Sequence, residues 1–252
     1  MTTAVLPGQS TGEPVQSAWL TRLRLNPAHR QVQRDLGNAV ALHRRVMTLV
    51  PDGLGSSPRA RAGVLFRLET DGAGAPALLV QSRIAPDTGR LPRGYAGVQT
   101  RDMNALFAAL RPGVYVRYRL LGNAVRRCGR NSTEGRWKQA IVLRGEEADR
   151  WWAERAAVAG LALHTVQSDG TDSLTAWHDR QQKQDGATSV ARDAKHRQGE
   201  DRVMVNHQAT RFEGLATVRD ADALRATLLH GVGRSKSYGC GLLSLAPGGR
   251  DR

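Results

Sequence analysis

The sequence has few of the residues that build disulfide frameworks, metal centres or membrane spans. Its 252 residues include two cysteines, Cys128 and Cys240, which are too few for a disulfide framework and lack metal-site spacing. The seven histidines form no pair at ligand spacing, which disfavours zinc. No apolar run reaches the length of a membrane span, and residues 1–17 lack the basic and apolar regions of a signal peptide. We therefore expect a cytoplasmic protein that uses no metal or other cofactor and has no membrane partner.

Acidic residues and lysine are also scarce, so that the chain is strongly basic through arginine. There are 37 Lys and Arg residues against 23 Asp and Glu, and the net charge is +14. Only four of the basic residues are lysines, at positions 138, 183, 195 and 236. Residues 1–150 hold 23 basic against 11 acidic side chains, whereas residues 151–252 hold 14 against 12. A GC-rich genome explains the preference for arginine but not this asymmetry, which favours a polyanionic partner such as nucleic acid.

The residue pattern predicts an α+β fold made of two tandem ferredoxin-like (RRM-like) βαββαβ domains after a flexible tail, residues 1–17. The predicted N-terminal domain, residues 18–138, has strands at 18–25, 64–69, 77–82 and 113–121, helices at 39–50 and 102–110, and a basic hairpin. The predicted C-terminal domain, residues 139–252, has strands at 139–143, 161–167, 203–218 and 242–245, helices at 146–159 and 221–229, and a glycine-rich loop at 231–241. Residues 168–201 are polar and are expected to form a surface excursion. Open sheets of this kind often bind RNA, although a fold alone does not settle function.

The densest run of positive charge lies between residues 117 and 138. It contains one acidic residue, Glu134, and seven basic ones: Arg117, Arg119, Arg126, Arg127, Arg130, Arg136 and Lys138. Arg117 and Arg119 are two residues apart on a predicted strand and therefore point to the same face. We expect a strand and hairpin that grip phosphates; the alternative is a solvated edge.

A glycine-rich segment near the C-terminus frames a second basic group. Gly231, Gly233, Gly239 and Gly241 surround Arg234, Ser235 and Lys236. Glycines allow backbone N–H groups to approach a phosphate closely, and the basic side chains complete the contact. The segment is not a Walker A loop, because Ser235 stands where that motif needs a glycine. A tight helix-to-strand connection explains the glycines equally well.

His43 is the candidate for acid–base chemistry. Helical spacing places it about 80° from the centre of the apolar face of the predicted helix 39–50, at the rim. Arg44 then points outward and Arg45 lies on the other flank. A half-exposed histidine beside arginines can act as an acid or a base near neutral pH, although many such histidines are only boundary residues.

Taken together, these features resemble the CasE family, the CRISPR repeat-RNA endoribonucleases of type I-E Cascade. The matching segments run in family order over nearly the whole chain after the tail, and the last of them is the most specific. They are WLTRLRLNP (19–27), RDL (34–36), LHR (42–44), RxRL (117–120) with Asn123 and the pair 126–127, FEG (212–214) and GVGxxKxxGxGLLSLAP (231–247).

The resemblance implies that the protein binds the stem-loop of the CRISPR repeat, cleaves it at the base of the stem and stays with the product among other Cascade subunits. The 2′-hydroxyl attacks the adjacent phosphorus in such enzymes without a metal, giving a 2′,3′-cyclic phosphate and a 5′-hydroxyl. His43 falls on the position of the catalytic histidine. The residues we expect to contact RNA are Arg34, Arg44, Arg45, Arg117, Arg119, Asn123, Arg126, Arg127, Arg130, Lys138, Arg234, Ser235 and Lys236.

The chain departs from the family pattern close to the candidate catalytic residue. Members often carry a tyrosine three residues before the histidine, where this chain has Val40, which can neither donate nor shuttle a proton. Leu121 and Ala124 also replace the common Arg and Pro near Asn123. Two alternatives to the enzyme therefore stand: an RNA-hairpin-binding subunit with weak or no catalysis, and a general basic ribonucleoprotein component.

Overall fold

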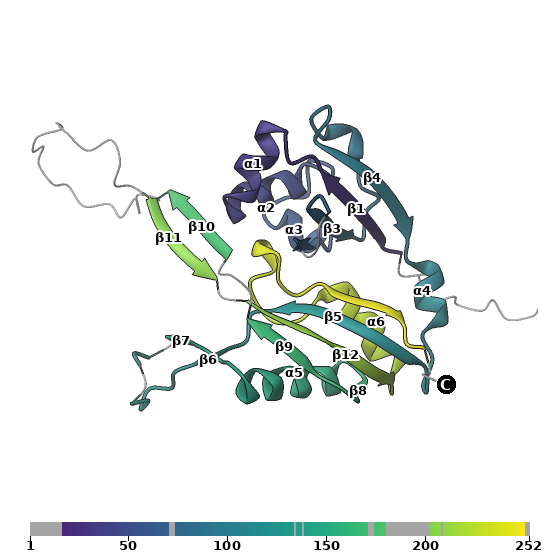
Figure 1. The fold of residues 1–252 in the computed structure, drawn as a ribbon, viewed down its shortest axis with the longest axis vertical. Coiled ribbons are helices and arrows are strands. Elements are labelled where there is room, and N and C mark those ends of the chain that lie inside the picture. The colour runs from purple at the N-terminus through teal and green to yellow at the C-terminus, as the bar shows by residue number, and fades with distance from the viewer. Residues whose placement is uncertain are drawn as a thin grey trace, which may run out of the picture.

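The structure is a computed structural model that describes residues 17–70, 74–133, 135–137, 139–170, 174–179, 202–207 and 209–249. Nearly all of the predicted tail, and most of the predicted surface excursion at 168–201, lie outside these residues. An antiparallel sheet of four strands and one of five follow one another along the chain, which confirms the predicted α+β class with tandem ferredoxin-like folds (Figure 1). No helix in these ranges is long and apolar enough to cross a membrane.

The first sheet has the strand order β2-β3-β1-β4, the ferredoxin-like order, and all its pairings are antiparallel. Its elements are β1 (Trp19–Leu25), α1 (Arg30–Leu36), α2 (Ala39–Met47), α3 (Pro58–Arg61), β2 (Leu65–Glu69), β3 (Ala77–Ser82), the short 3₁₀ helix η1 (Thr88–Arg90) and β4 (Ala96–Asp102). One face of the sheet is apolar because strand side chains alternate: Leu23 and Leu25 of β1 pack with Leu42 and Val46 of α2. The other face carries arginines and glutamines.

The second sheet has the order β13-β5-β12-β8, again the ferredoxin-like order. Its elements are β5 (Tyr115–Gly122), α5 (Glu146–Val158), β8 (Leu161–Leu163), β9 (Gln167–Gly170), β12 (Thr210–Val218), α6 (Ala221–His230), the short 3₁₀ helix η2 (Lys236–Tyr238) and β13 (Leu243–Pro247). Trp151 and Trp152 of α5 pack against Phe212 of β12 in the core. Helix α4 (Asn104–Ala109) connects the two sheets and contributes Phe107 to this second core.

The assignment of residues 113–121 to the first sheet was wrong. That strand is β5, and it pairs with β12 and β13 in the second sheet. The fourth strand of the first sheet is β4, which the sequence analysis missed, and the predicted helix 102–110 follows it as α4 instead of preceding the last strand. We therefore place the boundary between the two units between β4 and β5, not at residue 138.

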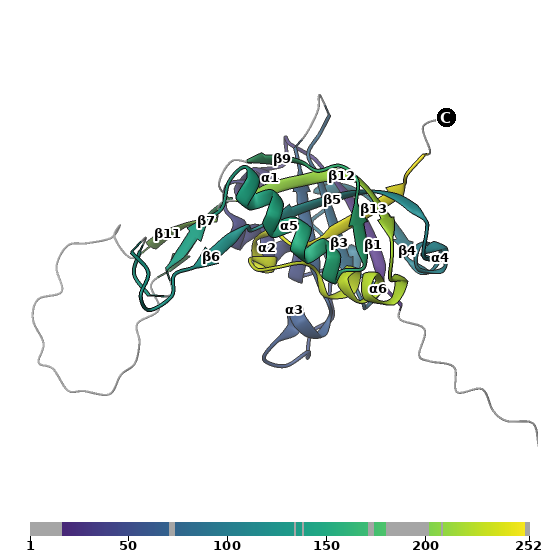
Figure 2. The same ribbon diagram turned by 90° about the horizontal axis from the view of Figure 1, so that it is seen from below.

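Two hairpins project from the sheets in the same direction (Figures 1 and 2). The segment 139–143, predicted to open the second domain, forms β7 (Ala140–Val142) and pairs with β6 (Val125–Arg127) in the first hairpin. The second hairpin joins β10 (Leu174–Asp179) to β11 (Arg202–His207). Part of the predicted surface excursion is thus strand, since β9 pairs with β12 and β10 with β11.

Candidate nucleic-acid site

Helix α2 places His43 at the edge of the first core. The side chain of Asn38 accepts a hydrogen bond from the backbone N–H of Val40 at 3.0 Å, which caps the helix. Leu42 and Val46 are buried, whereas His43 is half-buried and Arg44 is exposed. The rim position expected for His43 is therefore confirmed, although the helix ends at Met47 instead of residue 50.

The surroundings of His43 disfavour the charged form of its imidazole. Its ring lies against Phe66 of β2, with ring centroids 6.1 Å apart and an angle of 24° between the planes. The Nδ1 atom is buried and has no hydrogen-bond partner among the residues that the structure describes. Burial, and to a smaller extent the positive charge of Arg59, lower the pKa of His43 below its usual value. A neutral imidazole is ready to accept a proton.

The glycine-rich loop is seated on β2 beside α2. Gly231 and Gly241 both have positive φ, and the N–H of Val232 donates to the carbonyl of Gly241 at 2.9 Å, so the loop closes on itself. A Cβ atom on Gly241 would lie 2.6 Å from the carbonyl oxygen of Val232, and one on Gly239 would touch the ring of Phe66 at 3.4 Å. Phe66 therefore has His43 and the loop as neighbours, and these glycines are required by the geometry of the connection.

Two cationic side chains share the neighbourhood of His43. Lys236, in η2, donates from Nζ to the carbonyl of His230 at 2.7 Å. Burial and the charge of Arg59 lower the pKa of Lys236, and the same arginine lowers that of His43. Arg59, on α3, donates to the carbonyl of Val64 at 3.2 Å. The sequence analysis missed Arg59; a serine followed by proline, Ser57-Pro58, was the signal for the short helix that carries it.

Other predicted contacts lie around this cluster. Asn123, which follows β5, donates from Nδ2 to the hydroxyl of Ser235 at 2.5 Å and so ties the second sheet to the loop. Ser235 has a left-handed backbone with φ 59°, while Arg234 is exposed. Arg34 is exposed on α1. The structure thus brings Asn123 to the loop that carries Ser235 and Lys236, and this loop contacts α2.

Arg45 has a local structural role. Its Nε atom lies 2.8 Å from Oδ2 of Asp35 on α1, and its guanidinium lies over the ring of Tyr95 at 5.0 Å from the centroid. The hydroxyl of Tyr95 donates to the same carboxylate oxygen at 2.9 Å. The ion pair of Arg45 with Asp35 joins α1 to α2. Contact between Arg45 and RNA remains a prediction.

The arginines of the predicted basic stretch are divided between two places. Arg126, Arg127 and Arg130 are exposed on the β6–β7 hairpin, where Arg130 lies 5.2 Å from the ring centroid of the exposed Trp137. Lys138 lies outside the described residues. Arg117 and Arg119 lie instead on the face of β5 that is turned towards the first sheet, where Arg119 contacts Glu69 at 3.5 Å. They lie on the opposite side of the first sheet from His43. Phe66, which contacts His43, and Arg67, which donates to the carbonyl of Arg119, point to opposite faces of β2.

Comparison with known proteins places this arrangement in a family. The family model described as "CRISPR associated protein" matches residues 18–247. The CRISPR-associated endoribonuclease Cse3 of Thermus thermophilus is 34% identical over 231 residues, which cover 91% of this chain and 100% of Cse3. A solved structure of T. thermophilus Cse3 bound to an RNA representing a pre-cleavage complex has a TM-score of 0.71 at 31% identity and covers 92% of this chain and 100% of that one.

A chain from a second kind of structure is similar over the same length. It comes from a CRISPR RNA-guided surveillance complex, pre-nicking, with a TM-score of 0.63 at 35% identity, covering 91% of this chain and 99% of that one. The match of the family model to nearly the whole described chain, together with these relatives, confirms the resemblance found from the sequence motifs. This chain belongs to the CRISPR associated protein family.

Proposed function

We propose that this protein is a metal-independent endoribonuclease that binds the stem-loop of CRISPR repeat RNA and cleaves it in precursor transcripts. It works in the cytoplasm and stays on its product as a subunit of a Cascade surveillance complex. The observation that carries this proposal is the His43 site: a half-buried imidazole that lies against Phe66, with the cations Arg59 and Lys236 in its neighbourhood. The endoribonuclease relative and the chain from a surveillance complex support the substrate and the partner.

In the proposed reaction His43 moves the proton of the attacking hydroxyl. A ribose 2′-oxygen attacks the adjacent phosphorus while its proton passes to the imidazole. The bond from the phosphorus to the 5′-oxygen of the next nucleotide breaks, and that oxygen takes a proton from water or from the ammonium group of Lys236. The products are a 2′,3′-cyclic phosphate and a 5′-hydroxyl. Lys236 and Arg59 stabilise the negative charge that builds up on the phosphorane oxygens.

The binding surface that we propose extends from this site onto the hairpin and the loop. Its members carry positive charge or polar groups, and each is an expected contact to phosphate or sugar. They are Arg34, Arg44, Asn123, Arg126, Arg127, Arg130, Lys138, Arg234, Ser235 and Lys236. Binding through several phosphates makes the affinity fall steeply with salt.

The test is single-turnover cleavage of the cognate repeat hairpin in EDTA, with identification of the product ends. His43→Ala should keep its hairpin affinity and lose cleavage by about 100-fold or more. His164→Ala is the matched control, because His164 bonds to Thr217 in the second unit, and it should cleave as the wild type does. A 2′-deoxy nucleotide at the attacking position should block the reaction. Unchanged cleavage by His43→Ala would overturn the assignment.

A second candidate function is a hairpin-binding subunit without efficient catalysis. Val40, one helical turn before His43, supports it, because no side chain in the described ranges bonds to the buried Nδ1 atom and valine cannot supply a proton. The same experiment separates the two. Tight binding of the repeat with no product in EDTA or in Mg²⁺ would favour the binding subunit.

A further inference from the structure

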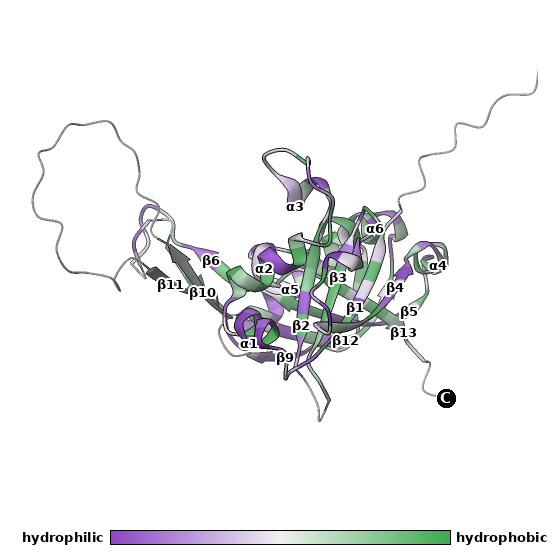
Figure 3. Cartoon of the chain, turned by 90° about the horizontal axis from the view of Figure 1, so that it is seen from above, coloured by the Kyte–Doolittle hydropathy of each residue, from purple (hydrophilic) through white to green (hydrophobic). Residues whose placement is uncertain are grey.

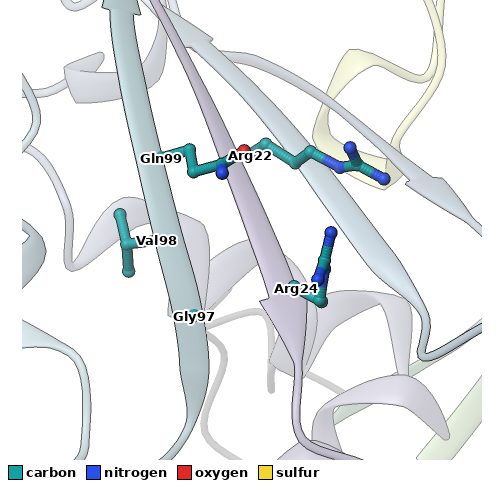
Figure 4. Close-up of a pocket in the computed structure, with 5 residues that line it drawn as sticks. All are labelled: Arg22, Arg24, Gly97, Val98 and Gln99. Carbon is teal, nitrogen blue, oxygen red and sulfur yellow. The ribbon is translucent and has the colours of Figure 1, made fainter.

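A pocket lies on the open face of the first sheet, on the opposite side from the helices. It is lined by Arg22 and Arg24 of β1 and by Gly97, Val98 and Gln99 of β4 (Figure 4). Gln99 is the register partner of Arg22, and Gly97 is that of Arg24. Since Gly97 has no side chain, it leaves the space beside Arg24 open. The two arginines stand on the same side of their strand, as Figure 4 shows.

The second unit covers only half of this face. On β2, Arg67 donates to the carbonyl of Leu242 at 2.9 Å and to the hydroxyl of Ser244 at 3.0 Å. On β3, Gln81 donates to the carbonyl of Leu228 at 2.7 Å. At the start of β1, Leu20 also packs against the core of the second unit, whereas Arg22 and Arg24, further along the strand, are exposed. The face is therefore closed along β2 and β3 and at Leu20, and open beside Arg22 and Arg24.

The second sheet turns a further exposed arginine towards the first sheet. The side chain of Arg119 on β5 reaches Glu69 of the first sheet at 3.5 Å, so this face of β5 is turned towards the first sheet. Arg117 is two residues earlier on the strand and points the same way. It is exposed, as is Arg101 on β4, which is paired in register with Leu20.

Charge is balanced at the closed end and unbalanced at the open end. Arg67 contacts Glu69 at 2.7 Å, and Arg119 contacts Glu213 at 2.9 Å. The four exposed arginines of the open end have no acidic partner within the part of the chain that the structure describes; they are Arg22, Arg24, Arg101 and Arg117. Four exposed guanidinium groups without acidic partners, two of them lining the pocket, attract a polyanion.

The chemistry of the opening selects the backbone of a nucleic acid strand. Side chains two apart on a strand are separated by about 6.8 Å, and guanidinium groups spaced in this way can each pair with a successive phosphate of an extended strand. No aromatic ring lines the pocket, so it offers no platform on which bases would stack. Contact through phosphates alone is sequence-independent.

We propose that the arginine face, defined as Arg22, Arg24, Arg101 and Arg117, is a second RNA-binding site that holds a single-stranded segment by its phosphates. This proposal rests on the proposed function for the identity of the polyanion. The site is separate from the His43 site, because Leu23 and Leu25 face α2 while Arg22 and Arg24 face away from it. The hairpin is bound at one face of the first sheet, and its single-stranded flank at the other.

The test compares two RNAs on the full chain carrying His43→Ala, so that nothing is cleaved. One RNA is the cognate repeat hairpin alone, and the other is the same hairpin with a uridine extension, placed at the 5′ end or at the 3′ end. The extension should tighten binding by about tenfold at low salt. Arg22→Gln with Arg24→Gln should remove this gain and leave the affinity for the bare hairpin within about twofold. For the extended RNA, the dependence of affinity on salt should weaken by the amount expected for the loss of about two phosphate contacts.

Arg111→Gln with Arg219→Gln is the matched control, because both arginines are exposed, lie in turns and have no ion pair within the described residues. It removes the same charge and should keep the gain from the extension. If the extension does not tighten binding while Arg22 and Arg24 are intact, the proposal is overturned. An acidic protein segment would then be the candidate ligand of the arginine face. Equal weakening of both RNAs by the Arg22 and Arg24 changes would also overturn it. Failure of the bare hairpin to bind would instead count against the proposed function.

Discussion

The ring of Phe66 lies 6.1 Å from that of His43, centroid to centroid. A Cβ atom added to Gly239 would lie 3.4 Å from the same Phe66 ring. Phe66 is fully buried in β2, so it fixes both the histidine and the glycine-rich loop against the first sheet. A position in a rigid strand is a better support for a catalytic group than a loop is. The geometry of the proposed catalytic site therefore depends on a residue that takes no part in the proposed chemistry.

Phe66→Ala should weaken both stability and cleavage. Removing a buried phenylalanine costs about 3–5 kcal/mol, and the cavity would let His43 and the loop move. Phe66→Leu should cost less stability and retain most of the activity. Urea unfolding and single-turnover cleavage of the two variants are the measurements. Full activity in a folded Phe66→Ala protein would show that the ring does not position His43.

The pH dependence of cleavage should follow the lowered pKa of His43. A general base must be neutral, so the rate should be at its plateau at pH 7 and fall only below the usual pKa of histidine. Arg59→Gln removes one cause of the lowering, so the acidic limb should move to higher pH, even if the plateau rate also falls. Arg61→Gln, an exposed neighbour on the same helix, should leave the limb in place. A limb that stays fixed in Arg59→Gln would contradict the cluster.

Arg44 and Arg45 are adjacent in sequence but should behave differently. The pair of Arg45 with Asp35 is nearly buried, with 18% and 6% of the two side chains exposed, so Arg45→Gln should cost about 3 kcal/mol in the free energy of unfolding. Arg44 is exposed, and Arg44→Gln should leave stability within about 0.5 kcal/mol and weaken hairpin binding. Denaturation and RNA affinity, measured on both variants, separate the roles. Equal stability loss in the two would refute the distinction.

The turn of the glycine-rich loop should not accept a side chain at Gly241. Its φ is +89°, and a Cβ atom would lie 2.6 Å from the carbonyl of Val232, a backbone atom that cannot move aside cheaply. Gly241→Ala should therefore lower the unfolding free energy by more than about 1 kcal/mol and displace Lys236. Gly129→Ala, with nothing within 4 Å of the added atom, is the control and should be tolerated. Thermal denaturation of both variants measures the loss of stability, and a cleavage assay measures the effect of displacing Lys236.

The sequence predicts the local features of this molecule better than its strand partners. Helical spacing placed His43 correctly at the rim of α2, since one apolar stripe fixes the orientation of a helix. The alternation of β5 shows that the strand has a buried face but not which sheet it joins, so it was assigned to the wrong one. Strand β4 was missed because it is an edge strand in which nearly every side chain is exposed, and it therefore shows no apolar period (Figure 3).

The candidate site could be predicted only where its residues carry a motif. His43, Ser235 and Lys236 stand in segments that resemble a family. Arg59 lies on a four-residue helix with no apolar pattern, and its proximity to His43 arises from tertiary packing. Arg22 and Arg24 were part of a matching segment, but their lack of acidic partners becomes visible only when the register of β1 and β4 is known.

Val40 offers a gain-of-function test of the proton transfer. It lies three residues before His43 on α2, and residues at this spacing are neighbours on a helix surface. Val40 is half-buried, so a larger ring can extend towards solvent beside the imidazole. Val40→Tyr adds a hydroxyl that can donate or relay a proton, and it should raise the single-turnover rate by about tenfold or more. Val40→Phe adds the same ring without the hydroxyl and should not accelerate cleavage. Equal rates in the two variants would mean that another group of the protein already donates the proton to the leaving oxygen. Lys236 would be the first candidate for that donor. Burial and the charge of Arg59 both lower its pKa, which makes the ammonium group a better proton donor.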